Sequence, residues 1–239
     1  SMERIDVGNL GSHGVSSIVG SPKGYAGSDE WGSLTKHLRT TPETLILFDE
    51  VEKAGKDPSA ELYLVLLALL DEGRVTERSC SQTVDATDAI IMMTSNANQK
   101  ELAELAERYK DDRDELDRAS RDALQDYFAP EFLGRIDVVT TVSKLTDMHT
   151  AEIVFLHLNK LVKSYDLELA DIDMNLLVEF VRKSKVMQNQ GMRGLIRHIE
   201  KVCGDGLIDA KKDNALKVGL SLEGEDKIIV DIIEFREDE

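Results

Sequence analysis

Short runs of apolar residues that end abruptly in polar ones mark the first part of the chain. Residues 44–48 (Thr-Leu-Ile-Leu-Phe) are followed by two acids, and residues 89–93 (Ala-Ile-Ile-Met-Met) by Thr-Ser-Asn. Such runs are typical of strands buried on both faces of a parallel sheet. Residues 138–142 predict a third strand, and residues 4–10 could hold another.

Helical patterns lie between these runs. Residues 33–39 and 58–71 predict helices. The charged segment 99–128 predicts helix with a solvated face, because its leucines recur at helical spacing. Residues 11–32 are rich in Gly and Ser and predict mainly loop.

The pattern changes after Lys144. Thr146 is suited to cap a helix. Three apolar stripes at helical spacing follow: Val154, Leu158, Leu161 and Tyr165; Leu177, Phe180 and Val181; Leu195, Ile196, Ile199 and Cys203. Residues 216–222 and 227–232 flank a polar stretch and predict a β-hairpin.

These patterns place a domain boundary near residue 145. Residues 1–145 predict an α/β fold with a parallel sheet and helices. Residues 146–239 predict a smaller, mostly helical domain with a β-hairpin, and no internal repeat is found in the sequence.

Charge narrows the classes of partner. The chain has 239 residues, of which 41% are hydrophobic, and a net charge of -17. No apolar run approaches the roughly 18 residues of a membrane span. Binding to nucleic acid or to an anionic membrane needs basic surface, so we expect neither partner.

Cysteine usage bears on the compartment. Cys80 and Cys203 are far apart and without a partner motif. A disulfide framework is therefore not expected, which favours a reducing compartment such as the cytoplasm or a mitochondrial or other organellar matrix. The five histidines form no metal-ligand spacing. Ser1 and Met2 are typical of a cloning scar before a truncated start, so no targeting peptide can be judged from them.

The strongest chemical signal is the pair of acids after the first apolar run. Residues 45–50 (Leu-Ile-Leu-Phe-Asp-Glu) resemble a Walker B motif. Ligands of open α/β sheets bind beyond the carboxyl ends of the strands. Asp49 is suited to hold Mg²⁺ there, and Glu50 to orient an attacking water. The alternative is a strand that simply ends in polar residues.

Five ordered segments resemble the Clp family of AAA+ ATPases. They are residues 20–27 with 32–35 (GSPKGYAG…GSLT), 49–54 with 70–76 (DEVEKA…LDEGRVT), 93–96 (MTSN), 130–137 (PEFLGRID) and 191–193 (GMR). The resemblance is to the C-terminal AAA+ module of ClpB-like disaggregases or the single module of their mitochondrial relatives. It implies an AAA+ large subdomain, a small C-terminal lid subdomain, and a homo-hexameric, ATP-dependent protein unfoldase that threads unfolded or aggregated polypeptides through its pore.

The resemblance also implies roles for single residues at the nucleotide. Asn96 matches sensor 1, and Arg193 matches sensor 2. With Asp49, these two are expected at ATP and its Mg²⁺. Arg135 matches the arginine finger, which reaches a neighbouring subunit, and is expected to act in catalysis together with Glu50. Without the resemblance, Arg193 is a helix surface residue.

The resemblance further implies a substrate-gripping pore loop. It comprises Lys23, Gly24, Tyr25, Ala26 and Gly27. An aromatic ring offers a large contact area to any polypeptide, and the glycines let the loop move. The alternative is that Tyr25 packs on its own domain.

Some positions depart from the family pattern. Ala26 stands for the usual Val, and Gly134 for Asn before the finger. For Arg135, the alternative without the family pattern is a salt bridge with Asp137 or Glu131.

One motif is missing. No Gly-x-x-x-x-Gly-Lys-[Ser/Thr] occurs in the 239 residues. Residues 4–7 resemble the family's strand after the P-loop helix, so we expect the chain to begin past the P-loop. ATP and Mg²⁺ are then cofactors of a parent protein, and this chain alone is expected neither to bind nor to hydrolyse ATP.

Two alternative functions remain to be compared with this one. The first is a naturally P-loop-less module for assembly or binding. The second is another AAA+ class, such as a clamp loader or helicase, which the acidic charge and the Gly-Tyr-x-Gly loop oppose.

The missing first strand matters for the expected fold. In the family's sheet it lies between the sensor-1 strand and the strand after the finger. Its absence leaves two unpaired backbone edges. We therefore expect direct pairing of residues 89–93 with 138–142, a strand swapped from another copy, or a disordered N-terminal third.

Overall fold

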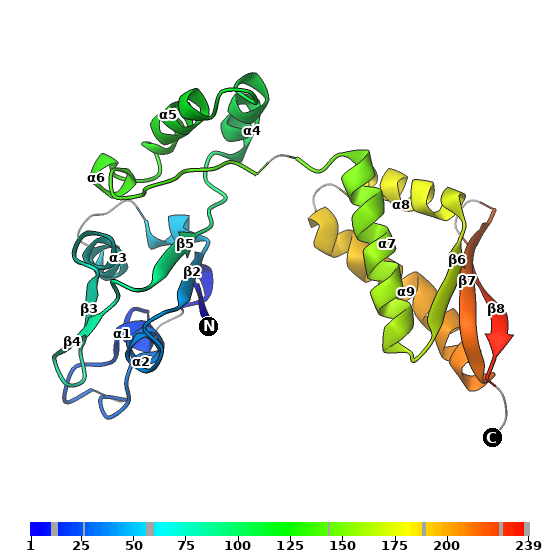
Figure 1. Ribbon diagram of the computed structural model, residues 1–239, viewed down its shortest axis with the longest axis horizontal. Helices are drawn as coiled ribbons and strands as arrows, with labels where there is room; N and C mark the ends of the chain where they lie inside the picture. The colour runs from blue at the N-terminus through cyan, green and yellow to red at the C-terminus, as the bar shows by residue number, and fades with distance from the viewer. Residues whose placement is uncertain are drawn as a thin grey trace. The chain divides into compact units, whose positions relative to one another are not determined.

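The protein is described by a computed structural model for residues 1–10, 14–25, 27–55, 60–142, 144–187, 190–224 and 227–236. The chain divides into two compact units, residues 1–143 and 144–239 (Figure 1). This division lies two residues before the boundary that the sequence pattern predicts.

The first unit is built on a parallel sheet. The strands of this unit are β1 (Met2–Asp6), β2 (Leu45–Asp49), β3 (Arg74–Glu77), β4 (Gln82–Asp85) and β5 (Ile90–Met93). Its helices are α1 (Ser16–Val19), α2 (Ser33–Thr40), α3 (Glu61–Glu72), α4 (Gln99–Arg108), α5 (Arg113–Leu124) and α6 (Pro130–Leu133), with 3₁₀ turns η1 (Val7–Asn9) and η3 (Val51–Ala54). The sheet has the order β1-β2-β5, and β3 and β4 form an antiparallel hairpin. The predicted α/β class with a parallel sheet is confirmed.

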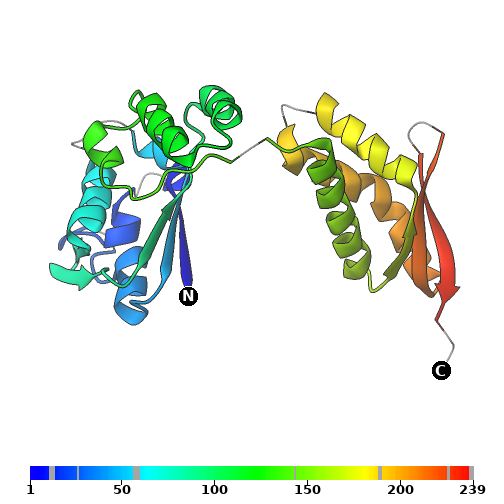
Figure 2. The same ribbon diagram turned by 45° about the horizontal axis from the view of Figure 1, so that its top comes forward.

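The two faces of this sheet differ in burial. Ile46 and Phe48 of β2 are fully buried on one face, where α1, α2 and α3 pack (Figure 2). On the other face, Ile90 is 67% and Met92 50% exposed. The prediction that both apolar runs are buried on both faces is therefore wrong for the second run, because no described segment of the unit covers this face of β5.

The predicted third strand is not formed. Residues 138–142 have no strand conformation, and Val138 and Val142 are exposed. A strand needs a neighbour for its backbone hydrogen bonds, but the Val139 N–H donates to the Asp117 carboxylate (3.0 Å). The expected pairing of residues 89–93 with 138–142 is absent from the described sheet. The expected disorder of the N-terminal third is also wrong for residues 2–6, which form β1.

The charged segment after β5 forms two helices instead of one. α4 ends at Arg108, and α5 begins anew at Arg113. Asp112 caps α5, since its side chain accepts a hydrogen bond from the Glu115 N–H (3.1 Å). The helices α4, α5 and α6 lie toward the end of the sheet at which the strands finish (Figure 2).

The second unit packs helices on one face of a small sheet (Figure 1). Its elements are α7 (Asp147–Ser164), β6 (Glu168–Ile172), α8 (Met174–Val186), α9 (Gly191–Lys212), β7 (Ala215–Glu223) and β8 (Lys227–Phe235). Thr146 caps α7 as predicted, accepting the His149 N–H (3.2 Å). The predicted hairpin is β7–β8, and β6 adds to it in parallel with β7.

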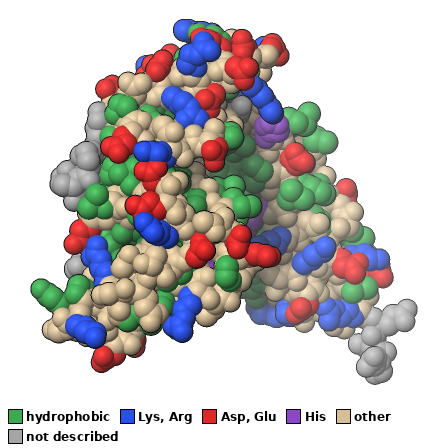
Figure 3. Space-filling view, turned by 60° about the vertical axis from the view of Figure 1, so that its left-hand side comes forward, with side chains coloured by type: hydrophobic (Ala, Val, Ile, Leu, Met, Phe, Trp, Pro, Cys, Tyr) green, Lys and Arg blue, Asp and Glu red, His purple; other side chains and the backbone are tan. Residues whose placement is uncertain are grey.

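None of the helices in the described ranges is long and apolar enough to cross a membrane. On the face shown in Figure 3, acidic and basic side chains lie interspersed with apolar ones.

Candidate functional site

Asp49 lies at the carboxyl end of the central strand β2. One of its carboxylate oxygens, Oδ1, accepts a hydrogen bond from the Thr94 hydroxyl at the end of the neighbouring strand. The other, Oδ2, accepts from Arg4 on β1. Arg4 reaches it because it pairs with Leu47 in the sheet register, two residues before Asp49, and residues two apart point to the same face. The Asp49 side chain is 23% exposed.

Thr94 fixes the turn that follows β2. Its hydroxyl oxygen accepts from the Glu50 N–H (3.2 Å), and its carbonyl oxygen accepts from the Val51 N–H (2.9 Å). Its own N–H donates to the Phe48 carbonyl oxygen (2.9 Å). The ends of β2 and β5 are thereby joined at the two acids.

Glu50 has an unusual backbone conformation. Its φ is 58° and its ψ 47°, in the left-handed region, which costs a residue other than Gly about 1–2 kcal/mol. Such conformations are concentrated at functional sites. The Asn96 amide lies 3.5 Å from Glu50 Oε1, and Gln99 holds that amide by donating to its Oδ1 (2.8 Å). A Cβ on Gly8 would lie 2.7 Å from Glu50 Oε2, so a larger residue there would displace the carboxylate.

The structure thus brings Asp49, Glu50 and Asn96 to one place, as the sequence predicts. It adds Arg4 and Thr94, to which the sequence assigns no role there. A strand end that carries two carboxylates calls for a positive or hydrogen-bond-donating neighbour, and this requirement is the signal that could have found them.

The oxygen atoms at this place are only partly suited to bind a hard divalent cation. Carboxylate and hydroxyl oxygens are the ligands that Mg²⁺ prefers, and Asp49 and Thr94 offer them. The Arg4 guanidinium, however, already neutralises Asp49. In the described residues no group of three or more His, Cys, Asp or Glu could hold a metal ion.

Arg135 follows α6 and forms an ion pair. Its partner is Asp71 near the end of α3. The alternative partners, Asp137 and Glu131, are therefore wrong. Both side chains of the pair are more than a third exposed, so the pair is weak and exchangeable.

The segment around Tyr25 is displayed to solvent. Tyr25 is 72% exposed, so the alternative that it packs on its own domain is wrong. Lys23, Gly24 and Gly27 are also exposed. Gly24 (φ 94°) and Gly27 (φ 80°) adopt backbone conformations that favour glycine, and Ala26 lies outside the described residues.

Arg193 belongs to the second unit. It lies in the first turn of α9 and is exposed. Gly191, the first residue of α9, has a φ of 59°, which sets the start of this helix.

Comparisons with known proteins identify the family. Residues 1–139 match the family described as "AAA domain (Cdc48 subfamily)". The chain is 34% identical over 244 residues to the ATP-dependent Clp protease ATP-binding subunit ClpC of Staphylococcus aureus, covering 96% of this chain and 28% of that protein. ClpC of Staphylococcus epidermidis is 33% identical over 243 residues. The chain therefore spans less than a third of the length of these relatives.

Solved structures give the same result. The Saccharomyces cerevisiae Hsp104:casein complex in its extended conformation matches with a TM-score of 0.74 at 27% identity, covering 96% of this chain and 40% of that one. The closed state of Hsp104 with ATPγS and FITC casein matches with a TM-score of 0.72 at 28% identity, covering 96% of this chain and 39% of that one. On the family match, the Clp relatives and this shared fold, the chain belongs to the AAA domain family and is a Clp-type AAA+ ATPase segment.

Proposed function

We propose that the chain is part of the ATPase module of an ATP-dependent protein unfoldase or disaggregase that works as a homo-hexamer and threads polypeptides through its pore. The meeting of Asp49, Glu50 and Asn96 at the carboxyl ends of β2 and β5 carries this proposal. Asp49 supplies an oxygen ligand for Mg²⁺, Glu50 orients the attacking water, and Asn96 contacts the γ-phosphate or that water. Bound Mg²⁺ would neutralise the charge that develops on the phosphates.

Two arginines complete the proposed machinery. Arg135 stabilises the transition state on a neighbouring subunit, and Arg193 links the nucleotide to the second unit. For this, Arg135 must leave Asp71. That exchange is cheap, because exposed ion pairs contribute only about 0–1 kcal/mol.

The exposed loop with Tyr25 is the proposed substrate contact. An aromatic side chain that is 72% exposed on a glycine-flanked loop offers an apolar, sequence-tolerant surface. Two solved relatives, both Hsp104, contain casein. Casein is therefore the probe that we choose for the polypeptide substrate.

We propose that the phosphate cradle is supplied by a P-loop outside these 239 residues. The exposed apolar side chains Ile90 and Met92 support this, because a further segment packed there would bury them. On its own, the 239-residue chain is expected not to bind ATP appreciably. Micromolar affinity in calorimetry with this chain would contradict that expectation.

The catalytic role is tested in the full-length protein with two isosteric changes. Glu50→Gln should abolish ATP hydrolysis and retain ATP binding. Glu43→Gln is the matched control, since Glu43 is exposed at the opposite end of β2. Equal hydrolysis in both variants would refute the proposed site.

A second candidate function is a binding module without catalysis. The pairing of Arg4 with Asp49 favours it, because a guanidinium already satisfies the carboxylate that should hold Mg²⁺. The two functions differ in the effect of Mg²⁺ on ATP affinity. An ATP affinity of the full-length protein that Mg²⁺ does not raise would support the binding module.

We also propose a reducing compartment, because Cys80 and Cys203 are both free.

A further inference from the structure

Glu77, the last residue of β3, is a fully buried carboxylate. Its exposed fraction is 0%. Oε2 accepts hydrogen bonds from the Thr35 hydroxyl and from the Gly32 N–H (3.0 Å), and Oε1 accepts from the Ser79 N–H (2.9 Å). An ion buried in this way must be compensated, or it costs several kcal/mol.

These hydrogen bonds keep Glu77 ionised. Burial alone raises the pKa of a carboxyl group. Here the hydrogen bonds from Thr35, Ser79 and Gly32 outweigh burial and hold the pKa of Glu77 below its usual value. The carboxylate also lies at the N-terminus of α2, where a negative charge is favourable.

Glu77 lies where the two ends of the Tyr25 loop (residues 21–25 and 27–31) meet. A Cβ on Gly32 would lie 2.3 Å from the carbonyl of Ile18 and 2.4 Å from the Gly20 nitrogen. A Cβ on Gly20 would lie 1.7 Å from Glu77 Oε1. The chain therefore leaves and returns at one crowded point, and Glu77 contacts both ends.

A second hydrogen bond joins the β3–β4 hairpin to the residues just before the loop. The Arg78 N–H donates to the Val19 carbonyl oxygen (2.8 Å). The hairpin therefore holds the start of the loop through Val19 and its end through Gly32.

We propose that Glu77 is a positioning residue that closes the base of the Tyr25 loop, so that the exposed Tyr25 is carried on a fixed stem. What the loop grips rests on the proposed function, but the closure itself does not. Because the loop base is held in a fixed geometry, a movement of β3 would also move Tyr25. The glycines within the loop still allow the backbone around Tyr25 to change conformation.

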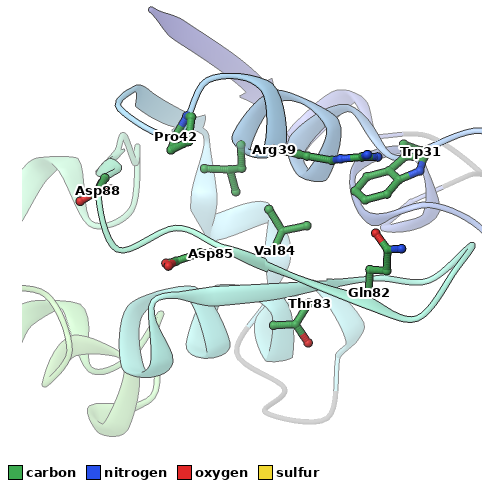
Figure 4. A pocket seen from close by; sticks show the side chains of 9 residues that line it. Trp31, Arg39, Pro42, Gln82, Thr83, Val84, Asp85 and Asp88 are labelled. Atoms are coloured by element: carbon green, nitrogen blue, oxygen red, sulfur yellow. The ribbon is translucent and has the colours of Figure 1, made fainter.

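Trp31 makes the closure measurable in this chain. It is the single tryptophan of the sequence and directly precedes Gly32. Its ring lies 4.5 Å from the Arg39 guanidinium carbon and lines an open hollow between α2 and β4 (Figure 4). Acrylamide quenching of Trp31, with hydrogen exchange of residues 19–25 and 27–32, therefore reports on the loop base.

Isosteric variants of the clamp form the test. We expect Glu77→Gln and Thr35→Val to speed exchange in these residues about tenfold, the effect of one lost hydrogen bond, and to increase Trp31 quenching. Thr35→Ser keeps the hydroxyl and should behave as the wild type. Glu72→Gln is the control, because Glu72 is exposed and pairs only with Arg74 in the described contacts.

Two results would overturn the proposal. The first is a hydrogen-exchange rate that is unchanged in both Glu77→Gln and Thr35→Val. Exchange that rises equally across the whole first unit would overturn it too, because it would mean a general loss of stability. If Glu77→Gln fails to fold, the comparison of Thr35→Val with Thr35→Ser decides.

A functional readout separates this inference from the proposed function. In the full-length protein, Thr35→Val should raise the KM for casein more than it lowers kcat, and Thr35→Ser should restore it. If Tyr25→Ala leaves casein processing intact while the clamp variants still loosen the loop, the substrate role fails and the clamp stands. If Tyr25→Ala abolishes processing and the clamp variants change neither exchange nor KM, the clamp fails alone.

Discussion

Arg121 of α5 donates a hydrogen bond from Nη1 to the carbonyl oxygen of Leu133 (2.7 Å). Its Nη2 donates to the carbonyl oxygen of Asp137 (3.2 Å). One side chain therefore spans the turn that carries Arg135. The proposed role of Arg135, contact with a neighbouring subunit, would gain from a backbone that is fixed on both sides.

Loss of this contact should loosen the turn. We expect Arg121→Met to lower the free energy of unfolding by about 1–3 kcal/mol, because the carbonyl oxygens of the buried Leu133 and the exposed Asp137 both lose a charged donor. Hydrogen exchange of residues 133–139 should rise most. Arg118→Met is the matched control, since Arg118 is 70% exposed and pairs with Glu115 on the surface. Equal effects of the two changes, measured by urea unfolding, would show that the contact is not structural.

The same network should depend on pH. The hydrogen bond from Arg121 lowers the pKa of Asp117 and, with the Val139 N–H, outweighs the opposing effect of burial. A carboxyl with a lowered folded pKa contributes stability above its unfolded pKa and loses it as pH falls through the folded one. The stability difference between wild type and Asp117→Asn should therefore be constant near neutral pH and shrink below about pH 4. Urea unfolding over this range measures it, and a difference that persists at the acid end would contradict the assignment.

The hydroxyl group of Thr94 should contribute to the rate of ATP hydrolysis. In the full-length protein we expect Thr94→Val to slow ATP hydrolysis about tenfold, equivalent to about 1.4 kcal/mol in the transition state. The valine can neither donate to Asp49 nor accept from the Glu50 N–H. Thr94→Ser retains both bonds and should stay near wild type. Equal steady-state rates for the two variants would exclude a role for the hydroxyl.

The meeting of Asp49, Glu50 and Asn96 could be predicted because each follows an apolar run. The carboxyl ends of neighbouring parallel strands meet at one edge of a sheet, so the strand pattern suffices. Arg4 could not be placed in this way. Its contact with Asp49 depends on the sheet order and on the register with Leu47, which linear spacing does not contain.

Elements whose pattern depends on a neighbour were harder to predict. Residues 138–142 have the composition of a strand, but no described strand pairs with them. β6 (Glu168–Ile172) was missed because it is mostly exposed and carries no clear alternation. The sequence assigns no role to Glu77, because its burial comes from Gly20 and Gly32, far away in sequence.

Glu50 should store backbone strain. Glycine adopts its φ of 58° without penalty, so we expect Glu50→Gly to raise the free energy of unfolding by about 1 kcal/mol. The same variant should lose ATP hydrolysis in the full-length protein. Glu52→Gly is the control, since Glu52 lies within η3 and should be destabilised by glycine. A Glu50→Gly protein less stable than wild type in thermal unfolding would argue against strain at this position.

The two thiols should differ sharply in reactivity. Burial raises the pKa of the Cys203 thiol to about 12, and its side chain is inaccessible in the core of the second unit. Cys80 is exposed. Because the thiolate is the reactive form, a disulfide reagent at about pH 8 should modify Cys80 rapidly and Cys203 only after denaturation. Cys80→Ser should remove the fast phase and Cys203→Ser should leave it, so two thiols reacting at one rate in the folded chain would contradict the burial of Cys203.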